Sequence, residues 1–189
     1  MSRERFRELM GDAVIGLPHD LKSVLRVVED EDVDDDARVL VAGSLLHVLS
    51  RGTAVPGVRG HLQHAGSVLL IRLALERACA ESPEAMAKHR EGAPEIFDTL
   101  EEQLEVSREF LGEGMKLLED TRGKLPKLNH EGHAAQACVS DEESINWLYD
   151  AVIEAPVEIL EDIDEEDVQR ELKGVEQIRK NLLRRLGRP

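Results

Sequence analysis

Residues 37–49 read Ala-Arg-Val-Leu-Val-Ala-Gly-Ser-Leu-Leu-His-Val-Leu, and residues 67–79 read Ser-Val-Leu-Leu-Ile-Arg-Leu-Ala-Leu-Glu-Arg-Ala-Cys. No other part of the chain is as hydrophobic. The link at 51–60 holds three glycines and a proline, which stop helices. This pattern predicts a buried helical hairpin over 37–79, with helices at 37–50 and 61–80. Small residues at Gly43-Ser44 and at Ala65-Gly66-Ser67 predict that the two helices cross closely at these points.

The composition favours helices over strands. Aromatic residues make up only 3% of the 189 residues, so Leu, Val, Ile and Ala must form the core. Leu, Glu, Arg and Ala, which are strong helix formers, are prominent throughout the chain. We therefore predict an all-α fold, an irregular bundle of six to eight helices in a single domain over 1–189. A hairpin-containing part at 1–80 is followed by C-terminal helices at 82–189.

Helical periodicity and breakers place the elements around the hairpin. The predicted order is a helix at 3–17 that ends before Pro18, a helix that starts at Pro18, a short helix at 83–92, a long helix at 94–120, a loop at 121–139, a helix at 141–154 that Pro156 breaks, and a last helix at 164–186. Ser140 and Glu143 have the spacing of a capping box for the helix at 141–154. Loops as long as 121–139 are often functional or mobile.

The charge excludes some partners. A net charge of −15 repels phosphate backbones and anionic lipid headgroups, so it argues against nucleic-acid binding and disfavours membrane association. Two cysteines without a C-x-x-C motif, and a charged amphipathic start without an apolar leader, predict a cytoplasmic protein. The acidic run at 29–36 predicts a solvated turn that caps the following helix, with a cation site as the alternative.

Histidine and cysteine spacing points to one candidate metal site. His130, His133 and Cys138 lie close together in the predicted loop, and imidazole and thiolate are the ligands that zinc prefers. His61-x-x-His64 is a second pair at short spacing, and solvent-exposed histidines are the alternative in both places. No Glu-x-x-His motif, nucleophile elbow or glycine-rich phosphate loop is present, so no catalytic or cofactor-binding residue is predicted.

The segment from Leu45-Leu-His-Val-Leu-Ser50 through Val55-Pro56 to Val68-Leu-Leu-Ile-Arg-Leu-Ala-Leu75 resembles the YkvA-like family of small bacterial helical-hairpin domains of unknown function. The resemblance covers residues 17–80. Where that family has a proline, two loop aspartates and paired aspartates, this chain has Arg51, Thr53, Gly57 and Gly66-Ser67, so no functional residue carries over. The resemblance implies a helical hairpin in a bacterial protein of the cytoplasm or the membrane periphery.

These observations favour a non-enzymatic acidic scaffold or adaptor that acts through protein partners or self-association. Two alternatives stay open. One is a metal-binding enzyme or sensor that uses the 121–139 loop, and the other is a peripheral membrane protein.

Overall fold

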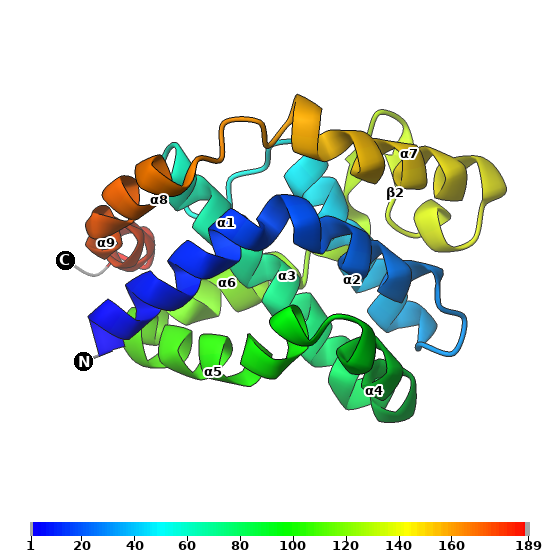
Figure 1. Ribbon diagram of the computed structural model, residues 1–189, viewed down its shortest axis with the longest axis horizontal. Helices are drawn as coiled ribbons and strands as arrows, with labels where there is room; N and C mark the ends of the chain where they lie inside the picture. The colour runs from blue at the N-terminus through cyan, green and yellow to red at the C-terminus, as the bar shows by residue number, and fades with distance from the viewer. Residues whose placement is uncertain (1, 188–189) are drawn as a thin grey trace.

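The computed structural model describes residues 2–187, and within them the chain folds as an all-α bundle (Figure 1). The α-helices are α1 (Ser2–Glu29), α2 (Asp35–Leu49), α3 (His61–Glu81), α4 (Pro83–Gly92), α5 (Pro94–Leu111), α6 (Met115–Arg122), α7 (Glu142–Glu158), α8 (Glu165–Glu171) and α9 (Glu176–Arg185). Short 3-10 turns are η1 (Gly112–Gly114), η2 (Leu125–Lys127), η3 (Ala137–Val139) and η4 (Leu172–Gly174). Strands β1 (Asn129–His130) and β2 (His133–Ala134) form one small antiparallel pair.

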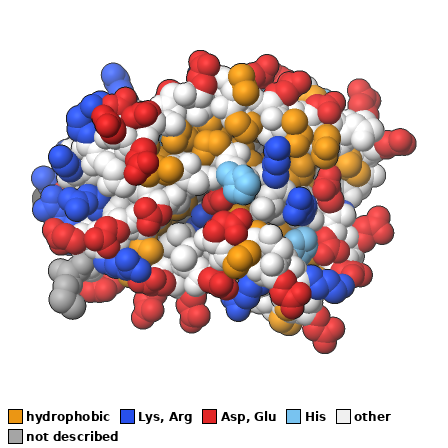
Figure 2. All heavy atoms as spheres, in the orientation of Figure 1, with side chains coloured by type: hydrophobic (Ala, Val, Ile, Leu, Met, Phe, Trp, Pro, Cys, Tyr) orange, Lys and Arg blue, Asp and Glu red, His pale blue; other side chains and the backbone are white. Residues whose placement is uncertain are grey.

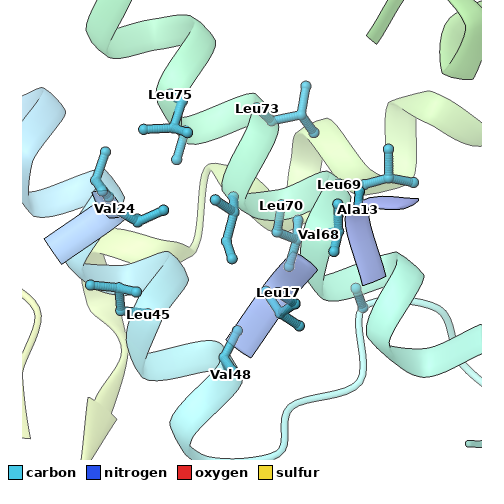
Figure 3. Packing of buried hydrophobic residues seen from close by; sticks show 14 of the residues in the cluster. Ala13, Leu17, Val24, Leu45, Val48, Val68, Leu69, Leu70, Leu73 and Leu75 are labelled. Carbon is cyan, nitrogen blue, oxygen red and sulfur yellow. The ribbon is translucent and has the colours of Figure 1, made fainter. Parts of the chain in front are cut away.

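The core lies where α1, α2 and α3 meet. Figure 3 shows buried side chains from the three helices, among them Leu17 and Val24 of α1, Leu45 of α2, and Leu69 and Leu73 of α3. The predicted hairpin is confirmed as α2 and α3, which share the most extensive contact in the fold. Helix α2 starts as its acidic cap predicts, because the side chain of Asp34 accepts a hydrogen bond from the backbone N–H of Ala37 at 3.0 Å.

Two predicted helix ends at proline are wrong. Pro18 lies inside α1 and Pro156 lies inside α7. A proline inside a helix removes a backbone hydrogen bond and costs about 3 kcal/mol. In α1 the buried stripe from Phe6 to Val28 continues on both sides of Pro18, and its burial outweighs this local cost.

Two predicted helices are each divided. The helix expected at 94–120 consists of α5 and α6 with η1 between them, because Gly112 adopts a left-handed φ of 55° that ends α5. The helix expected at 164–186 consists of α8, η4 and α9. The N-cap of α7 also differs from the prediction by one residue, since Asp141 rather than Ser140 accepts the hydrogen bond from the N–H of Ser144.

The segment 121–139 is folded onto the bundle instead of forming an open loop. It contains η2, the β1–β2 pair and η3, and it buries Leu125, Ala135 and Cys138. These apolar side chains give the segment an anchor that its irregular pattern did not reveal.

The small residues of the hairpin do not face each other as predicted. A Cβ atom on Gly43 would collide with the backbone carbonyl of Leu125 in η2. A Cβ on Gly66 would lie 3.1 Å from the Cβ of Ala54, in the link between α2 and α3. Each glycine therefore allows close approach of an irregular segment, not of the other helix.

One ion pair lies inside the core. Arg72 of α3 is 1% exposed, and it donates hydrogen bonds to Asp20 of α1 at 3.0 Å and to Gln103 of α5 at 2.7 Å. Burial raises the pKa of the Asp20 carboxyl, and the Arg72 guanidinium opposes that rise. Through these polar contacts Arg72 joins α3 to α1 and α5.

Among the described residues, no helix combines the length and the hydrophobicity needed to cross a membrane.

Candidate functional site

Helix α7 lies on the outside of the bundle with only one side covered. Leu148, Val152 and Ala155 point inward and are buried, and α7 contacts α1, α2 and η3. A helix on a protein surface normally turns polar residues to solvent on its outer side. The outer side of α7 departs from this pattern.

An apolar stripe runs along that outer side. Tyr149, Ile153 and Val157 are 49%, 38% and 72% exposed, and they are the large hydrophobic residues that remain exposed in the described part of the chain. Their spacing of four residues places them in one row on the helix. Figure 2 shows hydrophobic side chains gathered over α7, with acidic side chains around them.

An acidic row lies beside the apolar stripe. Asp150, Glu154 and Glu158 are exposed and follow the stripe one residue further along α7. Beyond this row lies a cavity of about 450 Å³, which is lined by Trp147, His130, Arg51, Asp150, Glu154 and Glu158 among others. The outer surface of α7 therefore combines an apolar stripe, an acidic row and a groove that contains the single tryptophan.

The histidines of the predicted zinc site pack against that tryptophan. His130 and His133 are paired across β1 and β2, and the ring of His133 stacks on Trp147 with centroids 4.4 Å apart. Nδ1 of His133 lies 2.9 Å from the hydroxyl of Ser144, and burial raises the pKa of the Cys138 thiol to about 11. The structure does not bring His130, His133 and Cys138 together as a group of ligand atoms within 4.8 Å of one another.

A different group of ligands does converge. Among residues 2–187, only His61, His64 and Asp162 form a set of three metal-ligand side chains whose atoms all lie within 4.8 Å of one another. The rings of His61 and His64 have centroids 5.8 Å apart, and Nε2 of His64 is 3.8 Å from Oδ1 of Asp162. The His61-x-x-His64 spacing was visible in the sequence. Asp162 lies in an acidic stretch far along the chain, and no signal in the sequence linked it to the two histidines.

The two histidines of this cluster are positioned by the first turn of α3. His61 is the first residue of α3, and its backbone N–H donates to the carboxylate of Glu171 in α8 at 2.8 Å. His64 lies one turn further along α3 and lines a cavity of about 160 Å³ together with Asp162. Burial lowers the pKa of His64, and the charge of Asp162 opposes that change. A neutral imidazole is the form that binds metals.

No family of known sequences, curated protein or solved structure matches the chain. The resemblance of residues 17–80 to the YkvA-like family therefore stays a prediction.

Proposed function

We propose that this protein is a non-enzymatic helical adaptor whose outer α7 surface binds a partner protein through a basic amphipathic helix. The observation that carries this proposal is the exposed row of Tyr149, Ile153 and Val157 on a helix whose other side is buried. Exposed apolar residues gathered in one row are typical of interaction sites, whereas single ones are common on any surface.

The charge around the stripe indicates the chemistry of the partner. An amphipathic helix docks by placing its apolar residues, spaced three and four apart, against an apolar surface. Asp150, Glu154 and Glu158 would then face the edge of that helix, and their negative charges favour lysine or arginine there. The net charge of −15 favours the approach of a basic partner over a longer range.

Self-association through the protein's own basic helix has less support. Helix α9 carries Arg179, Lys180, Arg184 and Arg185, and Figure 2 shows basic side chains gathered at that end of the molecule. Two of the three apolar residues of α9, Ile178 and Leu182, are however buried in the bundle, and the third, Leu183, is half-buried. A second copy could therefore offer the charge of α9 but only one partly exposed apolar side chain.

The experiment uses the fluorescence of the only tryptophan, Trp147, which lines the groove beside α7. The protein is titrated with a synthetic leucine–lysine peptide of amphipathic helical pattern, and with a scrambled peptide of the same composition. We expect saturable binding of the amphipathic peptide only. The variants Ile153→Gln and Val157→Gln should weaken it, and Val106→Gln on α5, a half-buried position away from α7, serves as the matched control.

Equal binding of the two peptides would show that charge alone drives the contact and would contradict the proposal. The same conclusion follows if both α7 variants bind as the wild type does. Light scattering of the free protein tests self-association, and a dimer that Val157→Gln converts to monomer would replace the partner helix with a second copy.

A further inference from the structure

We infer that His61, His64 and Asp162 form a binding site for a zinc-class divalent cation. This inference does not depend on the proposed function of α7, because the cluster joins the start of α3 to the connection between α7 and α8. Asp162 lies in a turn of that connection, and the buried Leu160 beside it anchors the turn to the bundle.

The donor set identifies the class of cation. Two imidazole nitrogens and one carboxylate oxygen suit zinc and other late first-row divalent ions, whereas calcium and magnesium prefer oxygen ligands throughout. Zinc–nitrogen bonds of about 2.0–2.1 Å place tetrahedral ligand atoms about 3.3 Å apart. The 3.8 Å separation between His64 Nε2 and Asp162 Oδ1 is close to this value. Asp162 is on an exposed turn, so a small movement completes the geometry.

An independent feature of His61 points to a ligand. Its side chain is 4% exposed, and its Nδ1 is buried without a hydrogen-bond partner among the described residues. A buried polar atom left without a partner costs about 1–3 kcal/mol, so proteins normally provide one. His64 lies one turn further along α3 and Asp162 lies in the α7–α8 connection, and a cation bound between them would bond to the His61 ring.

The surroundings fix the backbone that carries His61 and leave space beside the other two side chains. Glu171 accepts the backbone N–H of His61 and holds the start of α3 against α8. The cavity beside His64 and Asp162 measures about 160 Å³, which leaves room for a water molecule as the fourth ligand. A cation bound to these three protein ligands would hold the α7–α8 connection against α3.

Metal uptake by the full chain without a histidine tag tests the inference. The protein is dialysed against Zn²⁺ with a competing chelator, and bound zinc is measured by elemental analysis. We expect about one equivalent in the wild type. His64→Ala and Asp162→Asn should each weaken binding by more than the roughly 10- to 100-fold that losing an outer-shell partner costs. His133→Ala, which alters the site predicted from sequence, should bind as the wild type does.

Thermal unfolding provides a second measurement. Zinc should raise the melting temperature of the wild type and of His133→Ala, and it should leave Asp162→Asn unchanged. Asp162 is exposed, so that variant is expected to fold, and circular dichroism checks it. The inference is overturned if the wild type takes up no zinc, or if zinc uptake survives in both His64→Ala and Asp162→Asn. Loss of uptake in His133→Ala alone would place the metal in the 121–139 segment.

Discussion

The α2–α3 hairpin and helix α7 are both rich in apolar residues, yet the fold treats them in opposite ways. In α2 every side chain from Ala37 to Leu49 is buried, because other elements surround the helix. In α7 the inward side is buried and Tyr149, Ile153 and Val157 remain in solvent. The buried residues of the hairpin are covered by the chain itself, whereas part of the apolar surface of α7 faces solvent.

The difference predicts that substitutions in the two regions have different effects on stability. Substitutions at the buried positions of the hairpin should change the free energy of unfolding, because each of these positions has neighbours to lose or to displace. Substitutions on the outer side of α7 should leave that free energy almost unchanged. The predictions below test this contrast.

The largest effect is expected at the buried ion pair of α3. Arg72→Met leaves the Asp20 carboxyl without its partner in the core, and breaking such a pair costs about 3–5 kcal/mol. Urea denaturation should show this loss. Arg77→Met on the same helix removes an exposed pair with Glu81 and should cost no more than about 1 kcal/mol. Equal losses in the two variants would mean that the core does not depend on the Arg72 contact.

A pH dependence is expected from His47 of α2. Burial lowers the pKa of this imidazole from 6.5 to about 4, so the folded protein stays neutral there while the unfolded chain takes up a proton. The unfolded state therefore gains protons as the pH falls from 6.5 to about 4, and folding stability decreases through that window. At about 1.4 kcal/mol per pKa unit, the loss reaches about 3 kcal/mol.

The measurement is the free energy of unfolding at several pH values. The variant His47→Gln should lose much of the slope between pH 6.5 and 4, and His19→Gln, at an exposed position of α1, should keep it. Identical slopes in His47→Gln and the wild type would contradict the prediction.

A smaller loss is expected at Gly43. Its added methyl in Gly43→Ala would meet the Leu125 carbonyl, and overpacking of this kind costs about 1–3 kcal/mol. Gly16→Ala is the matched control, because a Cβ there lies 3.6 Å from the Asp20 carboxylate and meets only ordinary contact. That variant should gain up to about 1 kcal/mol from helix propensity. A gain in both variants would show that η2 moves away without cost.

The smallest effect is expected on the outer side of α7. Ile153→Gln should change the free energy of unfolding by less than about 0.5 kcal/mol, because the side chain is 38% exposed and lies away from the core. Leu148→Ala, on the inward side of the same helix, should cost about 2–5 kcal/mol. A large loss in Ile153→Gln would mean that the stripe supports the fold, and the case for a partner would weaken.

The proline positions show why local signals misplaced several helix ends. Pro18 and Pro156 are strong helix breakers by propensity, yet both lie inside helices. Helix α1 continues through Pro18 because buried residues on both sides keep it in the core, whereas α7 extends only to Val157 and Glu158, which are exposed, before it ends. The cost of one missing hydrogen bond is local, whereas the benefit of burial is summed over a whole stripe. A sequence pattern shows the local cost of a proline, but it does not show how much burial the rest of the helix gains.

The candidate sites differ in how much the sequence could reveal. His61 and His64 are separated by one helical turn, so their proximity was readable from the spacing alone. Asp162 comes from a turn almost a hundred residues away, and only packing of the α7–α8 connection brings it to them. The close spacing of His130 and His133 was also visible in the sequence. That spacing did not reveal that the ring of His133 stacks on Trp147.

The sequence by itself determined the all-α class, the central hairpin and the acidic character of the surface, because helix propensity, apolar periodicity and charge are properties of neighbouring residues. The tertiary structure decided what each helix faces. It put η2 against Gly43, left one side of α7 uncovered and joined Asp162 to two histidines. These outcomes depend on contacts between distant segments, which form only when the whole chain packs.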